Sequence, residues 1–327
     1  MVRVGILGTA RIARAFFGRA LQNAVFTAVA SRDKARADVF GAEFGIPRRY
    51  GSYEDLLRDP EVDAAYIPLP QHLHCEYTIK AARAGKHVLV EKPLALNVPE
   101  VESMVSACRE NGVFLMEAFM YRFKRIQHRV KDIISSGRIG TVTYIDFNWC
   151  FHIRTLTRSA FRMDRRTGGG ALYDLGIYGI DFIRFITGAE PQLLSAHLHR
   201  EPPDGVDLFS HAVFRIGDAT AAVTAAFNTD ANYYAVCGEK GSLYARAGLA
   251  GRWMENVLHM HLLGDDQFIE ERFPPENPYI SELEYFARCI EEKQKPFPDG
   301  ENSLKNIGIL EEVFARRVER KEESSAS

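Results

Sequence analysis

Val2–Ala13, with the sequence VRVGILGTARIA, decides how the first part of the chain folds. Its apolar start is typical of a buried strand, and a helical pattern over Arg11–Gln22 follows at once. Between the two lies a Gly-x-Ala-x-x-Ala variant of the dinucleotide fingerprint. Gly8 allows the tight turn, Ala10 lets the backbone approach a pyrophosphate, and Ala13 lets the helix pack closely on the strand. We therefore expect a strand–turn–helix unit that binds phosphate.

Short apolar runs continue to alternate with helical patterns as far as residue 121. We expect strands at Val2–Leu7, Val25–Ala30, Val62–Leu69, His87–Val90 and Val113–Glu117. We expect helices at Arg11–Gln22, Lys34–Phe44, Tyr53–Arg58, Leu73–Ala84 and Pro99–Asn111. The last of these has Asn97 as its N-cap, with Glu100 three residues later in a capping-box pattern. This alternation predicts an α/β fold whose first domain, residues 1–121, is a Rossmann domain with a doubly wound parallel sheet.

After residue 121 strands follow one another closely, which predicts a second α/β domain over residues 122–327. Its expected strands include Val142–Trp149, Leu193–Leu198, His211–Ile216, Ala221–Phe227 and Leu258–Leu263. Its expected helices are Ile126–Ser135, Ala171–Ile186, Tyr279–Lys293 and Ser303–Arg320. Because the strands are joined by short turns, we expect a large, open and mainly antiparallel sheet.

The composition is that of a globular protein of about two domains. The 327 residues are 46% apolar and 26% charged, and 41 basic against 43 acidic residues leave a formal charge of -2. This balance predicts no nucleic-acid surface, and no apolar run approaches the ~20 residues that a membrane span needs. The start of the chain leaves no room for a signal peptide, and five scattered cysteines form no disulfide framework. We expect a soluble, cytoplasmic protein that does not bind membranes.

The second strand ends without the acidic residue that usually bonds the adenosine ribose of NAD. In its place stand Ser31 and Arg32, with Arg36 one helical turn further on. Because the planar guanidinium fork suits a phosphate group, these residues favour NADP (NADPH) over NAD as the cofactor. The alternative interpretation is that Arg32 is an ordinary solvated side chain.

Gly85–Ala95, with the sequence GKHVLVEKPLA, places Lys92 just beyond the carboxyl end of a parallel strand. Ligands bind at this edge of open α/β sheets. Pro93 allows a cis peptide and a rigid turn after Lys92. A bare Lys-Pro pair would indicate only a surface turn, but the complete string is much more specific.

The chain resembles the family of glucose–fructose oxidoreductase, inositol dehydrogenase and MocA along nearly its whole length. The resemblance is carried by the Gly8 loop, Pro70–His74 (PQHLH), Glu91–Pro93 (EKP), Met116–Phe119 (MEAF) and Gly168–Tyr178 (GGGALYDLGIY). The last two motifs look most like the branch of dihydrodiol dehydrogenase and NADP-linked xylose dehydrogenase. Many members end the final motif with histidine, where this chain has tyrosine. The resemblance implies catalysis by Lys92 and Tyr178, with Asp174 in the substrate pocket, and an open sheet that often forms a dimer interface.

The same chemistry can be argued from the residue types. Hydride transfer between a sugar or alcohol carbon and nicotinamide C4 must be accompanied by proton movement at oxygen. A phenol is a poor base at its ordinary pKa of ~10, and a nearby ammonium such as that of Lys92 favours the phenolate. Asp174 and Tyr178 are four residues apart, so a helix projects both from one face. The alternatives are that Tyr178 is an aromatic of the helix core and that Asp174 caps the helix or pairs with an arginine.

Three sets of residues are predicted to form the site, of which the catalytic set comprises Lys92, Tyr178 and Asp174. The cofactor set comprises Gly8, Thr9, Ala10, Arg11, Ile12, Ser31, Arg32, Arg36, Leu69, Pro70, His72, His74, Glu91 and Lys92. The substrate set comprises Arg122, Arg154, Arg162, Asp174 and Tyr178. The arginine-rich stretch 154–166 has three interpretations: it recognises an anionic group on the substrate, reaches the NADP phosphates, or is solvated. Three His-x-His pairs lack a third ligand, so we expect no metal site.

The favoured function is that of an NADP(H)-dependent oxidoreductase acting on a sugar, cyclic polyol or dihydrodiol, assembled as a homodimer or larger homo-oligomer. A ketoreductase of a keto-sugar, perhaps nucleotide-linked, is the enzymatic alternative, which the arginine-rich stretch favours. The alternative from another class is a dinucleotide-binding redox sensor. A sensor is expected to lack the catalytic lysine or the proton relay, whereas Lys92, Asp174 and Tyr178 are all present.

Overall fold

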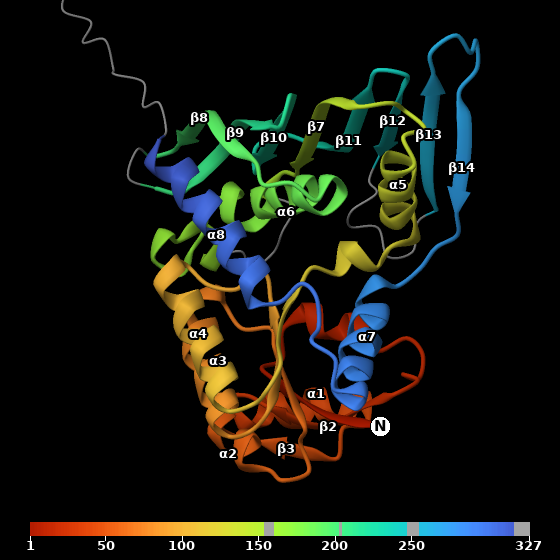
Figure 1. Cartoon of the computed structure of the whole chain (residues 1–327). Helices are drawn as coiled ribbons and strands as arrows, with labels where there is room; N and C mark the ends of the chain where they lie inside the picture. The colour runs from red at the N-terminus through yellow and green to blue at the C-terminus, as the bar shows by residue number, and fades with distance from the viewer. Residues whose placement is uncertain (154–159, 203–204, 247–254, 317–327) are drawn as a thin grey trace, which may run out of the picture. The chain divides into compact units, whose positions relative to one another are not determined.

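The computed structural model describes residues 1–153, 160–202, 205–246 and 255–316. The chain divides into two compact units, and Figure 1 labels many of their helices and strands. The described parts of the first unit are Met1–Lys124 and Pro275–Ile307. Those of the second unit are 125–153, 160–202, 205–246, 255–274 and 308–316. The sequence prediction placed 275–307 in the second domain, whereas in the structure the chain returns to the first unit.

The first unit contains the predicted parallel sheet, with the strand order β3-β2-β1-β4-β5-β6. Its strands are β1 (Val2–Leu7), β2 (Ala24–Ala30), β3 (Arg48–Tyr50), β4 (Ala64–Ile67), β5 (His87–Glu91) and β6 (Leu115–Ala118). Every neighbouring pair is parallel. The sequence analysis missed β3, because three polar residues at the edge of a sheet carry no apolar signal.

Two groups of helices pack around this sheet. One group is α2 (Tyr53–Arg58), α3 (His74–Arg83) and α4 (Val98–Glu110). The other is η1 (Arg11–Phe16), α1 (Lys34–Phe44) and α7 (Pro278–Glu292). The return of the chain has a physical reason, since the ring of Tyr279 in α7 packs edge-on against Phe16 in the core of this unit.

The helix predicted at Arg11–Gln22 is wrong in length and type. The structure has only a 3-10 helix, Arg11–Phe16. Phe16 is buried, and the next residue, the half-buried Phe17, stacks on Phe44 at 4.1 Å between ring centroids. The helix ends at these two aromatics, each of which packs against a ring from another element.

The predicted start of α4 is confirmed in its N-cap. The side chain of Asn97 accepts a hydrogen bond from the backbone N–H of Glu100 at 2.9 Å. The carboxylate of Glu100 reaches back one residue further than a capping box requires, and accepts from the N–H of Leu96 at 2.9 Å. The chain between Lys92 and α4 is therefore tied down at its end.

The second unit contains an open eight-stranded sheet in the order β14-β13-β12-β11-β7-β10-β9-β8. Its strands are β7 (Val142–Cys150), β8 (Gln192–Arg200), β9 (Asp207–Ile216), β10 (Ala219–Ala226), β11 (Ala231–Gly238), β12 (Gly241–Arg246), β13 (Asn256–Leu262) and β14 (Ile269–Phe273). The pairs are antiparallel except β7 with β10, which confirms a mainly antiparallel sheet.

The helices α5 (Arg125–Ser135) and α6 (Ile177–Thr187) pack on one face of this sheet (Figure 1). Side chains that point toward them, such as Phe147, Phe214 and Tyr234, are fully buried. Tyr144 and Tyr244, on the other face, are each 40% exposed. The last helix, α8 (Gly300–Ala315), begins in the first unit and ends in the second. In the part of the chain that the structure describes, no helix is both long and apolar enough to cross a membrane.

Candidate active site

The predicted cofactor residues gather at one edge of the parallel sheet. They follow the carboxyl ends of four neighbouring strands, β2, β1, β4 and β5, at residues 31–32, 8–12, 69–74 and 91–92. β1 and β4 are paired although they are not consecutive, so the strand order reverses between them. Open α/β sheets bind ligands in the crevice outside such a switch point. The loops that the sequence singled out therefore converge where the fold would receive a dinucleotide.

Gly8 makes the turn that a phosphate group needs. Its φ of +107° lies in the region that favours glycine, and its N–H donates to the carbonyl oxygen of Ala30 at 2.7 Å. A Cβ at this position would lie 3.1 Å from Cδ2 of Leu69, so any larger residue would crowd the space over the turn. The short 3-10 helix that follows aligns few peptide dipoles, which leaves more of the phosphate attraction to side chains such as the exposed Arg11.

Arg32 is the cation that lies near this turn. It is exposed, and its guanidinium lies close enough to the hydroxyl of Tyr53 to favour the phenolate; that hydroxyl oxygen would lie 3.9 Å from a Cβ placed on Gly8. Burial raises the pKa of Tyr53, and the Arg32 guanidinium opposes that rise. Arg36 pairs instead with Asp33 at 3.6 Å on the surface. Of Arg32 and Arg36, Arg32 is therefore the one that lies near the Gly8 turn, beside Tyr53.

The Lys92 turn lies at the end of β5, and its Lys92–Pro93 peptide is cis. The preceding Glu91 accepts a hydrogen bond from the hydroxyl of the buried Tyr66 at 2.6 Å. His74, predicted to face the cofactor, is buried, and its two ring nitrogens lie against carbonyl oxygens of the protein itself. This geometry favours a structural contact of His74 with the turn over a contact with a dinucleotide. His72 is exposed.

In the second unit, Asp174 and Tyr178 lie on a helix that is not regular. Asp174 belongs to a π-helical turn, Leu172–Gly176, which runs directly into α6 with Tyr178 at its second residue. The sequence analysis expected one continuous helix here. π-helical turns are rare and are frequent at functional sites. Glycine at 176 makes room for the side chain of Leu172, whose Cδ1 would lie 2.6 Å from a Cβ there.

Trp149 is a neighbour of Tyr178 that the sequence analysis did not identify. Its ring lies 4.3 Å from that of Tyr178 between centroids, at an angle of 46°. Trp149 comes from β7, and both side chains are almost fully buried. No local motif links a strand tryptophan to a helix tyrosine 29 positions later, so only the folded chain shows the pair.

Asp174 and Arg162, both predicted to bind substrate, form an ion pair. Nε of Arg162 donates to Oδ2 of Asp174 at 2.6 Å, with the arginine more exposed than the aspartate. The interpretation that Asp174 pairs with an arginine is therefore confirmed. The pair also fixes the carboxylate, because a charge-assisted hydrogen bond has a short and directed geometry.

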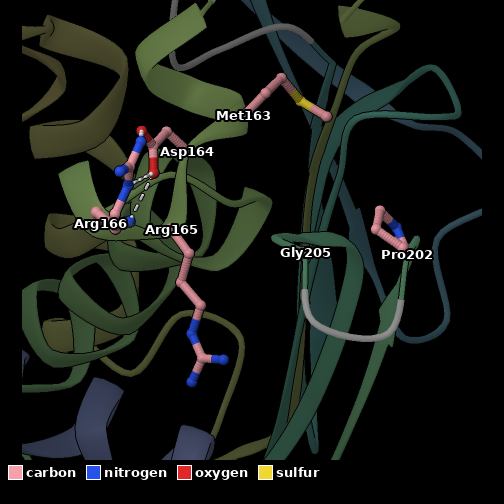
Figure 2. A pocket seen from close by; sticks show the side chains of 6 residues that line it. All are labelled: Met163, Asp164, Arg165, Arg166, Pro202 and Gly205. Atoms are coloured by element: carbon pink, nitrogen blue, oxygen red, sulfur yellow. Dashed lines mark hydrogen bonds and ion pairs between the residues drawn. The ribbon is translucent and has the colours of Figure 1, made fainter.

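The two other described arginines of the basic stretch lie in different environments. Arg166 folds back onto Asp164, while Arg165 extends away from that pair beside an open cavity (Figure 2). The cavity has a volume of about 780 Å³ and is lined by Met163, Asp164, Arg165, Arg166, Pro202 and Gly205.

Two further arginines belong to the predicted substrate set. Arg154 falls outside the described residues. Arg122 is buried in the first unit, with its guanidinium 4.8 Å from the ring centroid of Phe297. Among the described residues no group of three or more histidine, cysteine, aspartate or glutamate side chains is arranged to hold a metal ion.

Asp207 is the second residue that sequence reasoning missed, and it holds the start of the Asp174 segment. Its Oδ2 accepts from the backbone N–H of Leu172 at 2.7 Å. A Cβ on Gly170, whose φ is +121°, would lie 2.1 Å from Oδ1 of Asp207, so the glycine is required there. Burial raises the pKa of Asp207 to about 7, against the opposing effect of backbone hydrogen bonds and of Arg200. The three glycines 168–170 were the available signal that a side chain comes close to this backbone.

Comparison with known proteins agrees with this geometry. Residues 2–119 match an oxidoreductase family with an NAD-binding Rossmann fold, and residues 128–244 match the C-terminal domain of the same family. The D-xylose 1-dehydrogenase (NADP(+)) 2 of Haloferax volcanii is 35% identical over 319 residues, which are 95% of each chain. This chain belongs to the glucose–fructose oxidoreductase, inositol dehydrogenase and MocA family. The family and the fold class predicted from the sequence are both confirmed.

Other members of the family extend the comparison. A trans-1,2-dihydrobenzene-1,2-diol dehydrogenase of Xenopus tropicalis is 33% identical over 219 residues, covering 65% of this chain and 64% of the relative. The solved structure of a 3-ketoreductase from Actinomadura kijaniata, in complex with TDP-benzene and NADP, matches with a TM-score of 0.85 and 29% identity. That match covers 97% of this chain and 98% of the other. Structures of the same enzyme with one lysine or one tyrosine replaced also match.

Proposed function

We propose that this family member is an NADP(H)-dependent oxidoreductase acting on a carbon that bears a hydroxyl group in a sugar, cyclic polyol or dihydrodiol. The observation that carries the proposal is the convergence of the Gly8 turn, Arg32 and the Lys92 turn at the switch point of one parallel sheet. Nucleotide-binding groups and a lysine thus stand at the same sheet edge. The name of the Haloferax volcanii relative, which includes NADP(+), is consistent with this assignment.

The residues of the first unit suit NADP(H). Gly8 would let the backbone approach the pyrophosphate, and Arg32, which lies near Tyr53, would bind the 2′-phosphate through its planar fork. When bound, the cofactor supplies or receives the hydride at nicotinamide C4. Lys92 follows the carboxyl end of β5, two strands from β1. Its turn therefore lies at the same edge of the sheet as these groups.

The proton relay is assigned to Lys92 and Tyr178, as the family resemblance implies. The phenolate of Tyr178 would take the proton from the reacting hydroxyl in oxidation and the phenol would return it in reduction, and the ammonium of Lys92 would favour the phenolate form. Trp149 holds the plane of the Tyr178 ring, and the Arg162 pair fixes the carboxylate of Asp174 to orient the substrate. In this scheme the chain positions the substrate and moves a proton, and the hydride belongs to the cofactor.

The test is kinetic. Lys92→Met and Tyr178→Phe are each expected to lower kcat by about 10²- to 10⁴-fold, the contribution typical of general acid–base catalysis. NADPH binding, followed by fluorescence titration, should stay measurable in both. Tyr144→Phe, the same change on the exposed face of the second sheet, is the matched control and should turn over like the wild type.

Three results would contradict parts of the proposal. Near-wild-type turnover in Lys92→Met or Tyr178→Phe would remove that residue from the mechanism. Equal affinities for NADPH and NADH would contradict the role of Arg32. NADPH binding with no turnover across a broad panel of polyols and carbonyl compounds would support the redox sensor instead.

A ketoreductase acting on a nucleotide-linked keto-sugar is the second candidate. The observation that favours it is the open cavity beside Arg165, which offers a guanidinium to an anionic group. The Actinomadura kijaniata structure contains TDP-benzene, which is consistent with this alternative. Turnover of nucleotide-linked keto-sugars with NADPH, lowered at least about tenfold by Arg165→Ala, would favour this candidate over a free-sugar dehydrogenase.

We further propose that the uncovered face of the second sheet joins two copies of the chain, as the family resemblance implies. Tyr144 and Tyr244 are exposed there, and the ring of Tyr244 lies 5.8 Å from that of Tyr233 on the neighbouring strand. Aromatic side chains are enriched at protein interfaces. Sedimentation of the wild type as a dimer, and of Tyr144→Glu/Tyr244→Glu as a monomer, is the expected result. A monomeric wild type would contradict the interface.

A further inference from the structure

We propose that His74 and Glu117 are positioning residues for Lys92, acting through the backbone of the turn that follows it. The two side chains come from different elements, since His74 begins α3 and Glu117 lies in β6. They contact adjacent residues of the turn, His74 at the carbonyl of Pro93 and Glu117 at the N–H of Leu94. The inference rests on the proposed catalytic role of Lys92.

Glu117 is fully buried, and each of its two carboxylate oxygens accepts a hydrogen bond. Its Oε1 accepts from the N–H of Leu94 at 2.8 Å, and its Oε2 accepts from the hydroxyl of Ser303 at 2.5 Å. The same hydroxyl lies 3.1 Å from the carbonyl oxygen of Asp299. Since a buried carboxylate is tolerated only where donors surround it, these contacts fix Glu117 and with it the peptide two residues beyond Lys92.

His74 contacts the same turn at the residue before Leu94. Its Nδ1 lies 2.9 Å from the carbonyl oxygen of Pro93, and its Nε2 lies 2.8 Å from that of Leu69. Burial lowers the pKa of His74 to about 4, so the ring is neutral at neutral pH and carries one N–H. The ring therefore donates to one of the two carbonyls, and the proposed positioning role requires the N–H on Nδ1, which faces Pro93.

The far end of the turn is held as well, by the contact of Glu100 with the N–H of Leu96. The backbone after Lys92 is thus bonded at three places by side chains of the first unit. A turn held this fully presents its lysine in one position. A displacement of about 1 Å in a catalytic group can lower turnover by ~10²-fold, so loosening the turn should reduce kcat while cofactor binding survives.

The first test compares three variants. Glu117→Leu removes the acceptor for Leu94 and is expected to lower kcat about 10²-fold, with the Kd for NADPH changed by less than about threefold. Glu117→Gln keeps an oxygen for Leu94 and an amide donor for Ser303, so it should restore most of kcat. Ser303→Ala removes one donor of Glu117 but leaves the Leu94 contact in place, so its kcat should fall less than that of Glu117→Leu.

The second test uses two amides of different length in place of His74. An asparagine amide occupies the place of Nδ1 and keeps the contact with Pro93, whereas a glutamine amide occupies the place of Nε2 and keeps the contact with Leu69. His74→Asn is therefore expected within about tenfold of wild-type kcat, and His74→Gln about 10²-fold below it. Both variants carry the same functional group, so a general loss of packing does not predict this order.

The pH profile of kcat separates positioning from mere stability. Moving Lys92 away should shift the limb that reports the proton relay in Glu117→Leu, and Glu117→Gln should return it to the wild-type position. A folded Glu117→Leu with wild-type kcat and pH profile would overturn the role of Glu117. Equal or reversed kcat values for His74→Asn and His74→Gln would overturn that of His74.

The two proposals fail in different ways. Wild-type turnover in Lys92→Met would overturn the proposed function itself. An inactive Lys92→Met beside fully active His74 and Glu117 variants would overturn only the positioning role. If Glu117→Leu does not fold by circular dichroism, the His74→Asn and His74→Gln pair decides.

Discussion

Two buried carboxylates hold the two segments proposed for catalysis, and they differ in the hydrogen bonds that their oxygens accept. In the first unit, Glu117 has a donor at each oxygen, one from Leu94 and one from Ser303. In the second unit, Asp207 accepts from Leu172 with one oxygen, while the other faces the backbone at Gly170. Burial outweighs these contacts and raises the pKa of Asp207 to about 7.

Both carboxylates hold a backbone segment by accepting its N–H groups, but the two segments differ in structure. Glu117 supports an irregular turn at the end of a parallel strand, where a hydroxyl from α8 can complete its shell. Asp207 supports the start of a π-helical turn, where the backbone must come so close that only glycine fits at 170. We therefore expect the segment that carries Asp174 and Tyr178 to respond to pH through Asp207.

The largest expected effect is on the pH dependence of stability. The rise of the Asp207 pKa from 3.8 to about 7 means that the folded state favours the protonated acid. The stability contributed by this preference is complete below about pH 4 and is lost as the pH rises through about 7, to roughly 4 kcal/mol in total. Asp207→Asn cannot ionise and keeps an acceptor for Leu172. Its free energy of unfolding, relative to that of the wild type, should therefore increase as the pH rises over this range.

The measurement is urea unfolding of both proteins at several values between pH 4 and 8. The difference between variant and wild type is the relevant quantity, because other carboxylates contribute equally to both. A difference that is constant with pH would show that folding does not raise the pKa of Asp207, and would remove the pH response expected of this segment.

The next effect concerns the glycine that Asp207 requires. Gly170→Ala combines a positive φ with a Cβ 2.1 Å from Oδ1 of Asp207, and should destabilise the protein by about 3 kcal/mol. Gly188→Ala is the matched control, since its φ is +69° and nothing lies within 4 Å of its Cβ. That control should cost only about 1 kcal/mol. Equal losses in thermal unfolding would mean that the space beside Asp207 is not tight.

The smallest effect on stability is expected at the ion pair of Arg162 and Asp174. Arg162→Met keeps much of the aliphatic bulk but leaves Asp174 without this partner, and because the pair is partly exposed the loss should stay near or below ~1 kcal/mol. If the pair orients Asp174 toward the substrate, KM should rise at least about threefold in the same variant. An unchanged KM would indicate that the start of the helix, held by Asp207, suffices to place Asp174.

The parallel sheet was largely predictable because its signals are local. The apolar runs of β1, β2 and β5 and the helical spacing of α1 and α2 lie within single segments, and their predicted bounds agree closely with the structure. The polar edge strand β3 was missed, as were β11, β12 and β14, whose half-exposed residues carry a weak apolar pattern. The helix predicted to Gln22 stopped at Phe16 because tertiary packing drew its aromatics inward.

The sequence by itself determined the family, the Rossmann domain and the loops that gather at its edge, since motif spacing and strand ends are properties of neighbouring residues. Only the tertiary structure showed what holds those loops. His74 and Glu117 reach the Lys92 turn, Asp207 reaches Gly170, and Trp149 reaches Tyr178, each across 19 or more positions of sequence. Such contacts depend on which buried polar group finds its partner in the folded core, and no local pattern encodes that choice.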